Sequence, residues 1–228
     1  MERAETFTLE MFIRSHGFVA ARPTVFPATS RAGEINAQLA TVIAKLRQHA
    51  ATQSSSTRSS REETKLKSTR LDALQEDLEA IYRTARAIAL NRPGFDEKFR
   101  LPKNKGSQSW LAAARAIADE AEPSKEDFIR LGLPANFLED LRSDITEIEE
   151  IIHRQGQASG EGVAASAAID EAIEEGMKLV RELDAIIRNV YRDDPATLAE
   201  WTSARHIERA PRRNQTQQQQ EPNTPPTA

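Results

Sequence analysis

Apolar residues recur with helical spacing along the chain from Glu34 onward. The first run has the spacing i, i+4, i+7, i+8, i+11 and consists of Ile35, Leu39, Val42, Ile43 and Leu46. This spacing places the side chains on one face of a helix. The polar run TQSSSTRSS, residues 52–60, follows, and its composition predicts a flexible connection that ends the helix.

A longer apolar stripe follows this connection and predicts a helix over residues 61–91. Its members are Leu71, Leu74, Leu78, Ile81, Tyr82, Ala85 and Ile88. Pro93 and Gly94 then end the helix. Residues 34–91 are therefore predicted to form a helical hairpin with a polar connection.

A similar arrangement predicts a second hairpin over residues 135–192. Its helices, 135–155 and 163–192, are joined by the polar run GQASGEG, residues 156–162. The stripe of the first helix consists of Phe137, Leu141, Ile145, Ile148 and Ile152. The stripe of the second helix consists of Ile169, Ile173, Val180, Leu183, Ile187 and Val190. Neither hairpin can bury its stripe alone. We therefore expect an all-α domain over residues 34–210 in which the hairpins pack as an elongated four-helix bundle.

Shorter elements are predicted before and between the hairpins. Residues 1–33 form an N-terminal arm with a short helix, interrupted by prolines. Residues 92–134 form a crossover whose helix signals are Ser107 as an N-cap, Ser124 and Asp127 in capping-box spacing, and Gly132 as a C-terminal glycine.

The C-terminal region is predicted to contain one more short helix followed by a disordered tail. Asp194 and Pro195 have the residue types of an N-cap and a first helical position, so a helix is expected over 195–209. Residues 211–228 have no large apolar side chain that could dock on a core. We therefore expect this tail to be disordered.

Composition supports the helical interpretation and excludes some chemistry. Ala, Glu, Arg, Leu and Ile dominate, Gly is scarce at 9 residues and only 5% of residues are aromatic, a mixture that favours helices over strands. The chain has no cysteine, so disulfides, thiolate metal sites and cysteine nucleophiles are excluded. No run approaches the roughly 18 apolar residues of a membrane span, and the N-terminus lacks a signal-peptide pattern. We expect a soluble, cytoplasmic protein without membrane contact.

Charge is distributed unevenly along the chain. Residues 1–118 carry 19 Lys and Arg against 12 Asp and Glu, a balance of +7, and residues 119–184 carry 6 against 18, a balance of −12. One interpretation is a basic surface for nucleic acid. The other is that helices of opposite charge pack beside each other, which the wide spread of the basic residues favours.

Glu150 and His153 have the Glu-x-x-His spacing of metal ligands in helical bundles. At roughly 100° per residue, however, His153 lies about 130° and Glu150 about 170° from the centre of the apolar stripe. Bundle metals need ligands that project inward. We therefore expect no metal here and a solvated position for both side chains.

Basic residues near the C-terminus are weak candidates for phosphate contacts. They are Arg205, Arg209, Arg212 and Arg213. The chain shows no Gly-rich phosphate loop, no Gly-x-Ser-x-Gly elbow and no spaced Ser/His/Asp set. We accordingly predict no catalytic residues and no bound cofactor.

Gly176 lies on the apolar stripe of the last long helix, where glycine costs roughly 1 kcal/mol relative to alanine. With Ala172 it forms a notch that predicts close packing against a large side chain, for which Trp110 and Phe137 are candidates. A leucine at 176 is expected to destabilise the fold, and an alanine to be near neutral.

Several stretches resemble a group of uncharacterised soluble bacterial helical proteins with no known activity. They are RPGFDEKFRLP, WLAAARAIADEAEP, LGLPANFLEDLRSDI, AIDEAIEEGMKLVRELDAIIRNVYRDDPATLAEW and ARHIERAPRR. The resemblance implies a soluble bacterial helical protein and brings no functional residues.

The leading hypothesis is a non-enzymatic helical bundle that acts in protein–protein interaction or oligomerisation, with itself or another protein as partner. The alternative is a nucleic-acid-associated protein that uses the basic N-terminal half and the arginines near the C-terminus.

Overall fold

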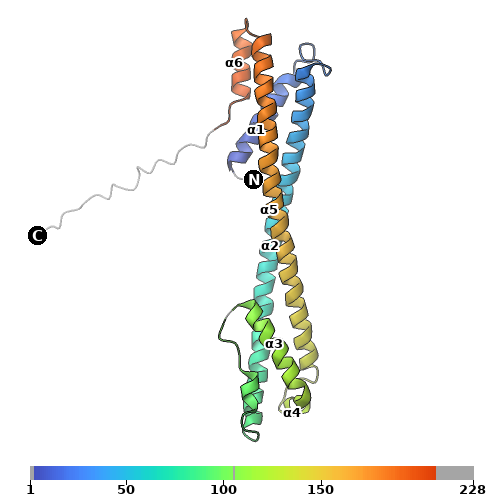
Figure 1. Ribbon diagram of the computed structural model, residues 1–228, viewed down its shortest axis with the longest axis vertical. Helices are drawn as coiled ribbons and strands as arrows, with labels where there is room; N and C mark the ends of the chain where they lie inside the picture. The colour runs from blue at the N-terminus through green and yellow to red at the C-terminus, as the bar shows by residue number, and fades with distance from the viewer. Residues whose placement is uncertain (1–2, 105, 209–228) are drawn as a thin grey trace, which may run out of the picture. The chain divides into compact units, whose positions relative to one another are not determined.

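The computed structural model describes residues 3–104 and 106–208, and within these residues every regular element is a helix (Figure 1). The order is α1 (Arg3–Ala20), α2 (Arg31–Ala89), η1 (Phe95–Phe99), α3 (Ser107–Ala121), η2 (Glu122–Ser124), α4 (Lys125–Arg130), α5 (Phe137–Val190) and α6 (Pro195–Ala204). The all-α prediction is confirmed. The chain divides into unit 1, Met1–Ala50 with Ala167–Ala228, and unit 2, Ala51–Ser166.

The prediction of two helical hairpins is wrong. Residues 31–89 form one continuous helix of 59 residues, and residues 137–190 form another of 54. The two polar runs, 52–60 and 156–162, were predicted as flexible connections but are helical throughout. A four-helix bundle built from hairpins 34–91 and 135–192 is therefore not the architecture of this chain.

Within unit 2 the two polar runs lie side by side and pair with each other, which explains why both are helical. We call residues 51–67 of α2 and 153–166 of α5 the polar seam. Side-chain hydrogen bonds join Gln53 to Ser166 (2.8 Å), Ser60 to Ser159 (3.3 Å), Gln155 to Thr64 (2.8 Å) and Lys67 to Gln155 (2.7 Å). Small side chains allow the helices to approach closely. Hydroxyl and amide pairs thus replace the apolar stripe over this stretch.

The core of unit 1 brings α1 and α6 against the N-terminal part of α2 and the C-terminal part of α5. The N-terminal arm is therefore mostly an 18-residue helix. Its buried face also includes Thr8 and Ser15, and these polar residues hide the helical period in the sequence. Both are satisfied locally, because the Thr8 hydroxyl donates to the Ala4 carbonyl (3.0 Å) and the Ser15 hydroxyl donates to the Met11 sulfur (3.6 Å).

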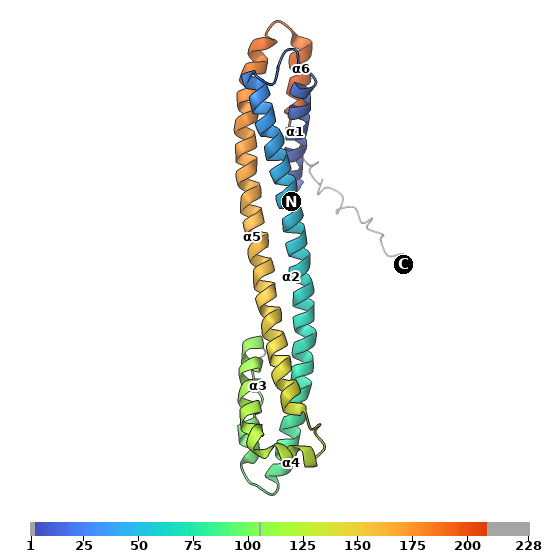
Figure 2. The ribbon, with the colours of Figure 1, turned by 90° about the vertical axis from the view of Figure 1, so that its right-hand side faces the viewer.

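The core of unit 2 includes much of the predicted crossover. Figure 2 shows α3 alongside the long helices of this unit and α4 at their end. Trp110, Leu111 and Ile117 of α3 are buried in the same cluster as the apolar stripes of α2 and α5. Four aromatic rings also pack together, with neighbouring centroids 5.1 to 6.0 Å apart: Phe95, Phe99, Phe128 and Phe137.

Two predicted helix-end signals are confirmed. Gly132 has a φ of 101°. It forms a Schellman motif, because its N–H donates to the Ile129 carbonyl (3.0 Å) and the Leu133 N–H donates to the Phe128 carbonyl (3.2 Å). Asp194 caps α6 by accepting from the Thr197 N–H at 3.1 Å.

Other predicted boundaries are corrected. Gly106, rather than Ser107, is the N-cap of α3. Ser124 is the N-cap of α4 but makes no side-chain capping bond. The Asp127 carboxylate, the other member of the predicted capping box, pairs with Arg92 (2.9 Å) and Arg130 (3.2 Å). The final helix ends at Ala204, because the next residues bind α1 and α5 instead. The predicted tail, 211–228, lies outside the described residues.

The predicted close packing at Gly176 is confirmed, although the partner is Phe12 of α1 rather than Trp110 or Phe137. A Cβ atom added at Gly176 would lie 2.5 Å from Cζ and 2.6 Å from Cε2 of the Phe12 ring. Ala172 is buried beside it, and Phe12 is fully buried. The ring therefore has no solvent space into which it could swing.

This contact changes the expectation for Gly176→Ala. The helix gains roughly 1 kcal/mol from losing the glycine, but overpacking typically costs about 1–3 kcal/mol. We expect Gly176→Ala to lower the free energy of unfolding by about 1 kcal/mol, and Gly176→Leu to lower it further. Chemical denaturation measures both changes.

Two further variants test the cause of this loss. Gly160→Ala, in the same helix but with nothing within 4 Å of the added Cβ, should stabilise by about 1 kcal/mol. In a Phe12→Leu background, Gly176→Ala should cost less, since the shorter side chain leaves room for the methyl group. An unchanged cost in that background would show that the ring is not the obstacle.

The polar seam should be the least protected part of the two long helices. It contains three helical glycines, each costing roughly 1 kcal/mol relative to alanine, and its buried apolar side chains are limited to Ala158 and Ala165. Hydrogen exchange measured by mass spectrometry should show faster exchange at residues 51–66 of α2 and 153–166 of α5 than at residues 74–88 of α2. Equal protection of these segments would refute the assignment of the seam as the weak stretch.

Candidate functional site

Glu150 and His153 are both exposed on α5, which confirms their predicted outward placement. His153 Nε2 lies 3.0 Å from Gln157 Nε2, and Glu150 lies 3.8 Å from Arg154. Among residues 3–104 and 106–208, no group of three or more histidine and acidic side chains is arranged to hold a metal ion. The Glu-x-x-His spacing therefore belongs to a solvated helix face.

Arg205, a candidate phosphate ligand, is engaged within unit 1. Its Nε lies 3.2 Å from Oδ1 of Asp184. Asp184 also accepts hydrogen bonds from Trp201 Nε1 (2.8 Å) and Arg188 Nε (3.0 Å). This carboxylate fixes α6 on α5, so Arg205 has a structural role. The other three candidates, Arg209, Arg212 and Arg213, lie outside the described residues.

The segment that follows α6 is also held by α1. Arg14 donates from Nη2 to the carbonyl of His206 (2.6 Å) and pairs with Glu208 (3.5 Å). Charged groups on α1 and α5 therefore pin residues 205–208 to unit 1.

Ion pairs between helices account for much of the uneven charge along the chain. In unit 1, α2 pairs with α5 through Arg31–Glu182 (2.7 Å) and Lys45–Glu175 (3.0 Å). In unit 2 the cross-helix pairs are Arg70–Glu147 (3.0 Å), Glu63–Arg154 (2.9 Å), Lys125–Glu139 (2.7 Å) and Arg142–Glu122 (2.7 Å). Each exposed pair is worth at most about 1 kcal/mol. Together they support the interpretation that oppositely charged helices pack side by side.

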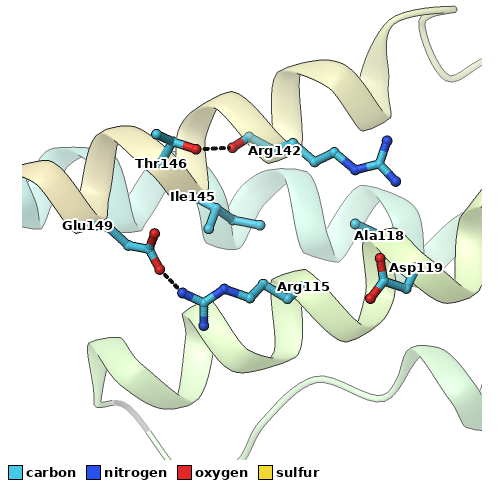
Figure 3. A pocket seen from close by; sticks show the side chains of 7 residues that line it. All are labelled: Arg115, Ala118, Asp119, Arg142, Ile145, Thr146 and Glu149. Carbon is cyan, nitrogen blue, oxygen red and sulfur yellow. Dashed lines mark hydrogen bonds and ion pairs between the residues drawn. The ribbon is translucent and has the colours of Figure 1, made fainter.

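A hollow between α3 and α5 in unit 2 gathers charged side chains (Figure 3). Its floor is closed by the buried Ala118 and Ile145. Arg115 forms an ion pair with Glu149, and Arg142 forms one with Glu122 at 2.7 Å. Because both arginines already hold carboxylates, the described residues of this hollow offer an anionic ligand no free cation.

Two carboxylates that face each other from α2 and α5 in unit 2 have perturbed acidities. Partial burial raises the pKa of Asp77, and the nearby charges of Asp144 and Asp140 raise it further. Partial burial likewise raises the pKa of Asp144, with the charge of Glu147 adding to the effect. Three acidic groups, Asp77, Asp140 and Asp144, thus repel one another across this helix pair at neutral pH.

A second hollow in unit 2 lies on the polar seam. Its lining from α2 includes Gln53, Ser56, Thr57, Ser60 and Arg61, and its lining from α5 includes Ala158, Ser159, Gly162, Val163 and Ser166. We call these residues the seam groove. The floor is made of small residues, since Ser56 is 3% exposed and Ala158 8%. Val163 stands on the α5 wall and is 72% exposed.

Sequence reasoning missed the seam groove because it took both polar runs for connections. A signal was nevertheless present. Ser56 and Ser60, like Ser159, Gly162 and Ser166, follow each other at spacings of three or four residues. That is a helical period of small residues rather than of large apolar ones.

Comparison of the chain with protein-family profiles, with curated protein sequences and with solved structures finds no match. The fold and the site are therefore interpreted from this chain alone. None of the described helices combines the length and the apolar character needed to cross a membrane.

The acidic group predicts a pH-dependent effect of Asp77→Asn. The folded-state pKa of Asp77 is raised, so its ionised form opposes folding at neutral pH, and this cost is lost as the pH falls through the raised pKa. The amide should therefore stabilise the protein at pH 7 by about a few tenths of a kcal/mol, because solvent screens a mostly exposed group. Urea denaturation should show a smaller difference near pH 4.

Asp72→Asn provides the control for this measurement, since it removes an exposed carboxylate from the same helix. Asp72 is not among the charges that act on Asp77 or Asp144. An equal gain from both substitutions would assign the effect to net charge rather than to the acidic group.

Proposed function

We propose that this protein is a non-enzymatic helical interaction module that binds another protein or a second copy of itself. The observation that supports this proposal is the seam groove, where a floor of small side chains remains open beside the exposed Val163. Small residues on a helix face permit close approach of another helix. Protein partners commonly use this kind of surface, in which a helix lies in a groove.

The charged hollow between α3 and α5 gives little support to the competing idea of a reaction on a small molecule. The hollow between α3 and α5 has a closed floor, and its arginines are paired with Glu149 and Glu122. A bacterial origin, which the resemblance of the sequence implies, and a cytoplasmic location, which its composition favours, are part of the proposal.

Nucleic-acid association is the second candidate, and one observation favours it. Arg58, Arg61 and Lys65 are exposed on α2, and no ion pair holds any of them within the described part of the chain. A nucleic-acid surface, however, generally uses many more phosphate contacts than three cations supply. The many basic residues that pair with α5 and other helices are not free for this purpose.

Site-specific photo-crosslinking of the full chain tests the proposal. A benzophenone amino acid at position 163 should give discrete protein adducts when the chain is expressed in its native cells. The same probe at Leu90, which is 85% exposed in unit 2, is the control and should not give those adducts. Adducts at position 163 that disappear with nuclease would favour the nucleic-acid alternative, and an absence of protein adducts would contradict the proposal.

A further inference from the structure

The two walls of the seam groove differ in chemistry. On the α2 wall, Arg61 is the charged lining residue, and Arg58 and Lys65 continue the same helix face at i−3 and i+4. On the α5 wall, the lining residues Ser159, Gly162 and Val163 carry no charge, and the neighbouring Glu161 accepts a hydrogen bond from the Ser56 hydroxyl of the floor (3.4 Å). The groove therefore has one basic edge on α2, and its α5 edge consists of small, partly apolar side chains with one carboxylate, Glu161, which is bonded to Ser56.

The cations on the basic edge differ from those that face α5 in having no hydrogen-bond or ion-pair partner among the described residues. Lys67 donates to Gln155 (2.7 Å), and Arg70 pairs with Glu147 (3.0 Å). Within the described residues, Arg58, Arg61 and Lys65 have no such partner. Glu62 lies on the same side of the helix, so the edge carries a net charge of +2, counted as three cations less one carboxylate.

The geometry points to an acidic amphipathic helix of a partner protein as the occupant of the seam groove. This inference rests on the proposed interaction function and names its site and partner class. Small residues in the floor admit a helix at close range. Carboxylates spaced i, i+3 or i+4, and i+7 on that helix would meet Arg58, Arg61 and Lys65, and an adjacent apolar row would cover Val163.

The affinity of such a complex should depend on both edges of the groove. Exposed charges steer association and lose strength as salt rises. The apolar contact with Val163 depends much less on salt. A helix with the right apolar row but basic residues in place of the acidic ones should therefore be excluded by repulsion.

Fluorescence anisotropy with two synthetic peptides tests the inference on the full chain. Both are helical and share an apolar row. One carries Glu at the three spaced positions and the other carries Lys. The Glu peptide should bind with a micromolar Kd that weakens at least about tenfold between about 20 mM and about 300 mM salt. The Lys peptide should not bind.

Matched variants then locate the contact. Arg58→Glu with Arg61→Glu should weaken binding of the Glu peptide at least about tenfold. The control, Arg83→Glu with Arg86→Glu, reverses two exposed cations at the same i, i+3 spacing on α2 and should leave binding unchanged. Val163→Ser removes the apolar contact without a change in charge and should weaken binding severalfold. Circular dichroism establishes that each variant is folded.

The remaining outcomes overturn the inference. These are no binding of the Glu peptide, equal loss in the control variant, or preferential binding of a DNA duplex that is abolished by Arg58→Glu with Arg61→Glu. Sedimentation that shows a dimer dissolved by the same reversal would assign the groove to a second copy. Protein adducts at position 163 without peptide binding would leave the proposed function in place and refute only the acidic-helix partner.

Discussion

The pairing of two polar runs along the seam is the interaction that makes the architecture of unit 2 possible. Isolated segments rich in Ser, Thr and Gly have little tendency to stay helical. Here each run supplies the other with small side chains and hydrogen-bond partners, such as Gln53 to Ser166 and Ser60 to Ser159. Without this mutual support, α2 and α5 would each break where their apolar stripes are interrupted.

The apolar pattern of the sequence predicted part of the fold, and the polar runs misled the prediction. The apolar stripes predicted the helical faces correctly, since Leu39, Leu78, Ile148 and Leu183 are fully buried. Local signals such as Gly132 and Asp194 also had their predicted roles. The polar runs were misassigned because the composition of a segment indicates only what that segment can bury by itself. It does not indicate what another segment contributes to its packing. Their helical state depends on a partner segment about a hundred residues away.

Tertiary contacts also decided the outcome at Gly176. The sequence indicated a notch, because glycine is less stable than alanine within a helix and is therefore expected on an apolar stripe where close packing requires it. It could not identify Phe12, which lies 164 positions earlier in α1. The buried face of α1 includes Thr8 and Ser15, so its period was hidden. Predicting this contact from sequence would require knowing that two polar hydroxyls are satisfied within their own helix.

We expect the seam to combine low local stability with an open surface, and the two properties are physically related. A stretch that packs with small side chains buries little apolar area, so its opening costs little free energy. The same small side chains leave a groove that a further helix can fill. A ligand that binds only the closed, helical seam stabilises it by RT ln(1 + [L]/Kd), about 2.7 kcal/mol at a hundred times the Kd. Occupation of the groove would therefore supply the burial that the two-helix seam lacks, and the protection of its amides would report that occupation directly.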